Sequence, residues 1–109
     1  MKKENRIKKN EEFTRIISKK HSLSNAVFIM YYDDRVLGHA RVVISVSKKI
    51  GNAVIRNKIK RQIRMMFIES FDNQAYKYDV IIIVRKKYLE NSYIDNKSYL
   101  EKLLKKAII

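Results

Sequence analysis

The sequence predicts a single α+β domain, and three observations support this fold class. Segments with helical periodicity and segments rich in β-forming residues follow one another in the order helix, strands, helix, strand, helix. The chain has 109 residues, the length of one domain with one modest core. Hydrophobic residues make up 46% of the chain, enough to form that core.

The first helix is expected to begin at Asn10, a residue type that favours the N-cap position. Glu11 and Glu12 follow in the first turn, where the helix dipole favours acidic side chains. An apolar face with helical spacing comes next, formed by Phe13, Ile16 and Ile17. The segment SLSN, residues 22–25, is expected to end the helix.

Two strands are expected after this helix. Residues 26–32, AVFIMYY, are rich in β-forming side chains, and Asp33–Arg35 should form a solvated acidic turn. Residues 39–47 alternate in polarity. One face carries Val42, Ile44 and Val46, and the other carries Arg41, Ser45 and Ser47, with Val43 among them. The two strands are predicted to pair with each other in antiparallel fashion and to have one polar face.

The longest helix is predicted from about residue 53 to residue 70, with Gly51 at its entry and Asn52 as its cap. At about 100° per residue, its apolar side chains gather on one face. This apolar face consists of Ile55, Ile59, Ile63 and Met66. The neighbouring arc, called the cationic face below, consists of Arg56, Asn57, Lys60, Arg61 and Arg64.

The remaining elements are one strand and one helix. Tyr78–Val84 contains five consecutive apolar residues, which is typical of a strand covered on both faces. Ser92 and Asp95 resemble a capping box at the start of the last helix. The buried side of that helix is predicted to be Leu100, Leu103, Leu104 and Ala107.

The charge of the chain predicts an anionic partner. The formal net charge is +14, from 25 Lys plus Arg against 11 Asp plus Glu, and the pI is near 10.1. A solvated helix face is the alternative interpretation of the cationic face. Against it, no acidic side chain is interleaved there, and like charges such as Arg56 and Lys60 stand four residues apart. Arginine also suits phosphate oxygens. We expect no membrane partner, because the apolar faces are needed for the core.

The residues do not predict catalysis by this chain. There are no cysteines and only two glycines, so no thiolate chemistry or phosphate-binding glycine loop is expected. His21 and His39 have no carboxylate at metal-ligand spacing beside them. The charged N-terminal segment and the lack of an apolar run approaching about 20 residues predict a cytoplasmic location.

The segment SVSKKIGNAVIRNKIKRQIR, residues 45–64, closely resembles the signature of the protein subunit of bacterial ribonuclease P. Arg56-Asn57-Lys58 stands at the arginine-asparagine-arginine element of that family. RIKKNEEF at 6–13 and YDVIIIVRK at 78–86 match at the family spacing, so the resemblance covers nearly the whole chain. It implies elements in the order α-β-β-β-α-β-α, a mostly antiparallel four-stranded sheet, and a left-handed crossover through the basic helix.

The resemblance also implies a division of labour with RNA. In the family, a large catalytic RNA performs magnesium-dependent removal of the 5′ leader of precursor tRNA, and the RNA holds most of the magnesium. The protein binds that RNA and the leader, and no protein partner is implied. One alternative is a general RNA-binding or ribosome-associated protein with no part in cleavage. A protein-only nuclease is a second alternative, which would need clustered carboxylates for two metal ions.

The family roles are carried over position by position. The positions that match RNA-binding residues are Ser47, Lys48, Lys49, Arg56, Asn57, Lys58, Lys60, Arg61, Arg64, Arg85 and Lys86. Those that match the cleft for the leader are Phe13, Ile17 and Tyr31. No catalytic residue and no metal ligand is carried over. Lys58, Ile17 and Val43 depart from the usual family residues, which are arginine, an aromatic residue and glycine respectively.

Overall fold

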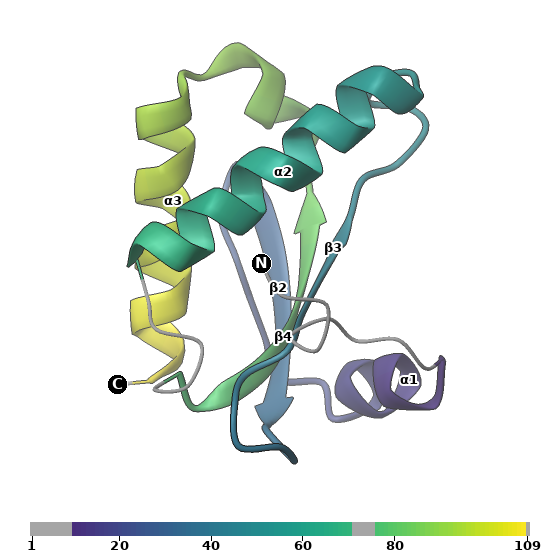
Figure 1. Cartoon of the computed structure of the whole chain (residues 1–109), viewed down its shortest axis with the longest axis vertical. Helices are drawn as coiled ribbons and strands as arrows, with labels where there is room; N and C mark the ends of the chain where they lie inside the picture. The colour runs from purple at the N-terminus through teal and green to yellow at the C-terminus, as the bar shows by residue number, and fades with distance from the viewer. Residues whose placement is uncertain (1–9, 71–75, 109) are drawn as a thin grey trace.

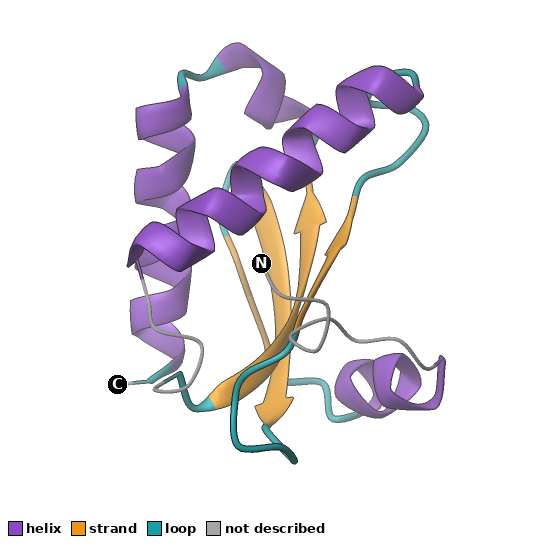
Figure 2. Cartoon of the chain, viewed as in Figure 1, coloured by secondary structure: helices purple, strands orange, loops and turns teal. Residues whose placement is uncertain are grey.

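Helices and strands follow one another as an α+β fold in the computed structural model, which describes residues 10–70 and 76–108 (Figures 1 and 2). The elements are α1 (Asn10–Ser18), β1 (Ser22–Ser24), β2 (Phe28–Asp34), β3 (Val42–Ser45), α2 (Ala53–Ser70), β4 (Tyr78–Val84), the 3₁₀ helix η2 (Lys86–Glu90) and α3 (Tyr93–Ala107). This order confirms the predicted fold class. The part of the matching block RIKKNEEF that precedes residue 10 lies outside the described residues.

The four strands form one sheet in the order β1-β2-β4-β3. β2 is antiparallel to β1 and to β4, whereas β3 is parallel to β4. The predicted pairing of β2 with β3 is therefore wrong, because β4 lies between them. β4 carries the longest apolar run, and a strand that is apolar on both faces is most stable in the interior of a sheet. Local patterns predicted residues 22–25 only as the end of the first helix, whereas the order implied by the family resemblance includes the additional strand that β1 supplies.

The connection from β3 through α2 to β4 is left-handed. β3 and β4 are parallel neighbours, and Figure 1 shows both running upward with α2 in front of the sheet and β4 to the left of β3. A right-handed connection seen from the helix side would place the second strand to the right. The family expectation of a left-handed crossover is therefore confirmed, against the strong general preference for the right-handed form.

The main core lies between one face of the sheet and the helices α2 and α3. It includes Phe28, Met30, Val80 and Ile82 from the central strands, Ile59, Ile63, Met66 and Phe67 from α2, and Leu100, Leu103, Leu104 and Ala107 from α3. The predicted buried side of α3 is thus confirmed. Two predicted caps are also present: Asn52 Oδ1 accepts from the Ile55 N–H at 3.0 Å, and Ser92 Oγ accepts from the Asp95 N–H at 3.2 Å.

One member of the predicted apolar face of α2 is not in the core. Ile55 is 39% exposed, so the buried face begins one turn later, at Ile59. Figure 1 shows the first turn of α2 beyond the upper ends of the strands, where no sheet lies beneath it. Helical periodicity gives the direction in which a side chain points but does not show where the opposing sheet ends.

The second face of the sheet is covered at one end by α1. Ile16 and Ile81 are fully buried but lie outside the main core cluster, because they belong to this second layer. Burial on both faces of β4 confirms the prediction from its apolar run. No helix in the described ranges is long and apolar enough to cross a membrane.

Charged side chains are buried beside α1, which the sequence did not predict. Asp33 lies within β2 and pairs with Arg15 at 3.1 Å, so the expectation of a solvated acidic turn is wrong for this residue. Arg41 was assigned to a polar strand face but is only 5% exposed. Its guanidinium pairs with the carboxylate of Asp79 at 3.0 Å. A buried charge of this kind requires a partner of opposite sign, and these partners are distant in sequence.

Candidate nucleic-acid interface

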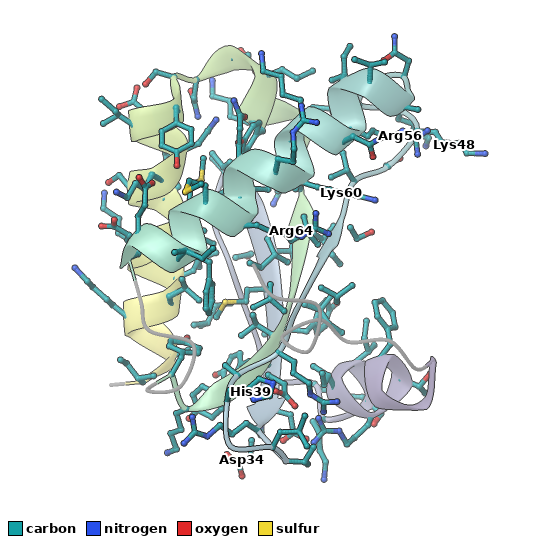
Figure 3. The ribbon with its side chains drawn as sticks, in the orientation of Figure 1. Asp34, His39, Lys48, Arg56, Lys60 and Arg64 are labelled. Atoms are coloured by element: carbon teal, nitrogen blue, oxygen red, sulfur yellow. The ribbon has the colours of Figure 1, made fainter. Side chains whose placement is uncertain are left out.

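The cationic face of α2 lies on the side of the helix that points toward β3, the edge strand of the sheet. Figure 3 shows Arg56, Lys60 and Arg64 projecting from the side of α2 that lies toward β3. All three residues are half-buried, while Asn57 and Arg61 are exposed. Successive residues of a helix are about 100° apart, so the buried residues of α2 and the cations point in different directions. Because the buried residues face the sheet, the cations face outward.

Three cations of this face have no acidic partner within the described ranges, 10–70 and 76–108. There, Arg56, Lys60 and Arg61 form no ion pair with a carboxylate. The ion pairs found within these ranges instead join Arg15 and Arg41 to the sheet, link two side chains of η2, and link α2 to α3. A surface of close cations without acids suits a polyanion, whose phosphates remove the repulsion between neighbouring charges.

Lys58 lies on a different side of α2 from Arg56. The two residues are about 200° apart on the helix, and Lys58 lines an open pocket of about 330 Å³. The other residues that line this pocket are Ile55, Ile59, Gln62, Tyr88, Leu89 and Asn91. The structure therefore divides the Arg56-Asn57-Lys58 element between two surfaces, and Lys58 is turned toward η2.

The loop before α2 presents two further cations next to the cationic face. Ser47 holds the loop, because its hydroxyl accepts from the Lys49 N–H at 3.2 Å and its carbonyl accepts from the Ile50 N–H at 3.0 Å. Ile50 is buried and anchors the loop to the core, while Lys48 and Lys49 are exposed. Figure 3 shows Lys48 pointing away from the fold near Arg56.

Arg85 and Lys86 follow β4 and are both exposed. The guanidinium of Arg85 donates to the carbonyl of Asn25 at 3.3 Å. η2, which begins at Lys86, is held against α2 by a hydrogen bond of 2.8 Å from the Tyr88 hydroxyl to Gln62 Oε1. These two cations therefore belong to the η2 side of the molecule, together with Lys58, rather than to the cationic face.

The three predicted cleft residues lie on the second face of the sheet. Phe13 and Ile17 are four residues apart on α1, so they form one stripe, and both are half-buried. Tyr31 is half-buried on β2, opposite Ile81 of β4, on the face that α1 covers. We call the surface formed by Phe13, Ile17 and Tyr31 the leader cleft. It combines aromatic and apolar side chains from α1 and β2.

Sequence patterns missed Arg15, which connects α1 to this face of the sheet. Its guanidinium contacts Asp33, the carbonyl of Asp34 and, 64 residues away in the chain, Asp79. A single arginine in an amphipathic helix is ordinary, and no local pattern marks a partner so distant. The only available signal was an acidic residue, Asp79, at the start of an otherwise apolar strand.

The described residues do not fit a magnesium site. They contain no group of three histidine, cysteine or acidic side chains placed to hold a metal ion. The carboxylates of Asp33 and Asp79 are already paired with arginines. His21 packs against the ring of Tyr32 at 5.7 Å instead of facing a carboxylate.

Comparison with known proteins identifies the family. The family model for ribonuclease P matches residues 1–108. The ribonuclease P protein component of Mesoplasma florum is 47% identical over 105 residues, which cover 95% of this chain and 96% of the relative. That of Bacillus pumilus is 43% identical over 110 residues, which cover 100% and 92%.

Solved structures with the same fold support this family assignment. A Staphylococcus aureus RNase P protein mutant with defective mRNA degradation activity superimposes with a TM-score of 0.85 at 42% identity, over 96% of this chain and 89% of that chain. The RNase P protein from Thermotoga maritima gives a TM-score of 0.80 at 26% identity, over 93% and 96%. Because the family model matches nearly the whole length of this chain, the chain belongs to the ribonuclease P protein family.

Proposed function

We propose that this chain, as the protein subunit of ribonuclease P, binds the catalytic RNA through α2 and the leader of precursor tRNA through the leader cleft. The observation that carries the proposal is the cationic face of α2, where Arg56, Lys60 and Arg61 have no acidic partner in the described ranges. That face lies toward β3, the edge strand of the sheet, and the leader cleft lies on the opposite face of the same sheet.

The RNA contacts proposed for α2 are phosphate contacts. The side chains involved are long, cationic and on the surface, and cations of this kind make most of their contacts to nucleic acid at phosphate oxygens. Their contribution to affinity should fall with increasing salt, because phosphate binding releases counterions. Lys48 and Lys49 extend this contact from the loop, and Lys58, Arg85 and Lys86 supply a second contact beside η2.

The leader cleft suits an unpaired RNA strand. Phe13 and Tyr31 offer rings on which bases of any identity can stack, and Ile17 adds an apolar wall. The cleft therefore favours a single-stranded leader over a mature tRNA, which has no leader to place in it.

The magnesium required by the holoenzyme is assigned to the RNA. By neutralising phosphates, the cationic face lowers the repulsion that a compact RNA complex must overcome, so cleavage should need less magnesium when the protein is present. A magnesium titration of cleavage with and without the protein tests this step. An unchanged midpoint would contradict it.

Reconstitution tests the proposed function as a whole. The protein is mixed with a catalytic ribonuclease P RNA and a precursor tRNA at low magnesium, and 5′ cleavage is measured. We expect stimulation of cleavage by the protein and no cleavage by the protein alone. RNA binding without stimulation would favour the general RNA-binding alternative. Cleavage of precursor tRNA or of an mRNA by the protein alone would favour a nuclease.

A further inference from the structure

Arg15 and the Phe13–Ile17 stripe lie on opposite flanks of α1. At about 100° per residue, Arg15 is turned about 100° to one side of Ile16, while Phe13 and Ile17 are turned about 60–100° to the other side. Ile16 is fully buried and marks the line along which α1 contacts the sheet. The helix therefore contacts the sheet along Ile16, with the cleft residues on one flank and a charged residue on the other.

Arg15 makes three directional contacts with the sheet. Its Nη1 donates to Asp33 Oδ2 at 3.1 Å and to the Asp34 carbonyl at 3.2 Å. Its Nη2 donates to Asp79 Oδ2 at 3.0 Å. Asp33 and Asp79 are partners across the β2–β4 ladder. Because the planar guanidinium has a fixed geometry, donating to two adjacent strands restricts its orientation as well as its position.

The anchor for Arg15 is itself rigid. The side chain of Asp79 has no solvent exposure. Its Oδ1 accepts from the Arg41 N–H at 2.9 Å, and its Oδ2 accepts from the Arg41 guanidinium at 3.0 Å. Two arginines thus face two carboxylates, Asp33 and Asp79, so the charge of Arg15 is matched within the protein. This balance distinguishes Arg15 from Arg56, Lys60 and Arg61 of α2, which form no ion pair with a carboxylate among the described residues.

The leader cleft lies one row of side chains away from this ion-pair network. Tyr31 precedes Asp33 by two residues on the same face of β2, a distance of about 6.6 Å along the strand. Burial of Ile16 holds α1 against the sheet, but apolar contact is non-directional and leaves the rotation of the helix about its axis poorly defined. The contacts of Arg15 on one flank fix that rotation, and with it the position of Phe13 and Ile17 on the other flank.

We propose that Arg15 is a positioning residue for the leader: it fixes the rotation of α1 and so sets the position of Phe13 and Ile17 relative to Tyr31. This inference rests on the proposed leader cleft and adds the element that gives the cleft its shape. Arg15 acts through other side chains, so its removal should affect only substrates that reach the cleft.

The test compares Arg15→Gln with the unchanged protein in the reconstituted holoenzyme. Affinity is measured for a precursor tRNA with a long leader, for one with a single-nucleotide leader and for mature tRNA. We expect Arg15→Gln to weaken binding of the long-leader substrate by about tenfold, to raise its KM and to leave kcat nearly unchanged. Binding of the other two RNAs and of the catalytic RNA should not change.

Matched variants separate this role from general stability. Lys97→Gln removes a different ion pair, the one with Glu69 at 3.6 Å, and should not change the affinity for the long-leader substrate. Arg15→Lys keeps the charge but loses the fork geometry, so it should fall between the original protein and Arg15→Gln. It also serves as the test variant if circular dichroism shows that Arg15→Gln does not fold.

The outcomes distinguish this inference from the function on which it rests. An equal loss of affinity for all three RNAs, or no loss for any of them, would overturn the positioning role of Arg15. If Phe13→Ala weakens leader binding while Arg15→Gln and Arg15→Lys do not, the cleft stands and the positioning role is wrong. If Phe13→Ala also has no effect on leader binding, the proposed cleft itself is wrong.

Discussion

Arg41 and Asp79 form a buried ion pair that joins the parallel strands β3 and β4. The Arg41 N–H donates to one carboxylate oxygen of Asp79 at 2.9 Å, and its guanidinium donates to the other at 3.0 Å. The Val80 N–H in turn donates to the Arg41 carbonyl at 3.0 Å. These contacts fasten the start of β3 to β4 on the side of the sheet where α1 packs, so the same carboxylate supports the sheet and, through Arg15, the first helix.

Asp79→Ala should strongly destabilise the fold. The substitution removes the buried carboxylate that the Arg41 guanidinium contacts at 3.0 Å, and breaking a buried ion pair typically costs about 3–5 kcal/mol. Urea denaturation followed by circular dichroism measures the free energy of unfolding. Lys97→Ala, which removes the more exposed pair with Glu69, serves as the control and should cost less than about 1 kcal/mol. Similar losses for the two variants would contradict a structural role for the buried pair.

Arg61→Ala should weaken binding to the catalytic RNA by about 1 kcal/mol, because the side chain is exposed and is proposed to contact a phosphate. It should also reduce the slope of log affinity against log salt by about one. Filter binding across a series of salt concentrations measures both quantities. Lys105→Ala removes an exposed cation from α3, away from the cationic face, and should change neither. An unchanged slope for Arg61→Ala would exclude a phosphate contact by this residue.

Phe13→Ala should chiefly reduce discrimination between precursor and mature tRNA. Loss of one stacking ring weakens binding of an unpaired strand by about 1–3 kcal/mol. Binding of mature tRNA should not change, because mature tRNA has no leader that could stack on this ring. Binding of both RNAs to the holoenzyme is compared. Thr14→Ala, at the exposed neighbouring position, is the matched control. An equal reduction for both RNAs would show that Phe13 does not contact the leader.

Tyr76→Phe should change how stability depends on pH in alkaline solution. Burial, followed by the neighbouring Tyr78 and Tyr32, raises the pKa of Tyr76 in the folded state, whereas the pKa of tyrosine in an unfolded chain is roughly 10. A raised folded pKa stabilises the fold fully below about pH 10, and this contribution declines at higher pH as the unfolded chain ionises. Tyr76→Phe should therefore show a shallower loss of stability above pH 10.

Tyr76→Phe should also lower the free energy of unfolding at neutral pH. The Tyr76 hydroxyl donates to the Leu104 carbonyl at 2.8 Å, so its removal should lower stability by about 1 kcal/mol. Denaturant unfolding at neutral pH and at several alkaline pH values checks both effects. Parallel stability curves for the two proteins would show that Tyr76 ionises equally easily in the folded and unfolded states.

Much of the fold could be predicted from local patterns. The periodicity of residues 53–70 predicted α2 with its bounds, the apolar run of β4 predicted burial on both faces, and Asn52 and Ser92 were recognised as caps. These features depend on neighbours within about four residues, whose geometry is fixed by the helix or strand itself. The left-handed crossover came only from the family resemblance, since no local pattern encodes the handedness of a connection.

What the sequence by itself determined was the separation of a cationic from an apolar face on α2, and with it the expectation of a polyanion. The tertiary structure decided the rest. It placed β4 between β2 and β3, exposed Ile55 beyond the end of the sheet, turned Lys58 toward η2, and paired Arg15 with an aspartate 64 residues away. The physical reason is the same in each case: these features depend on which distant segment lies opposite, and local spacing carries no information about that.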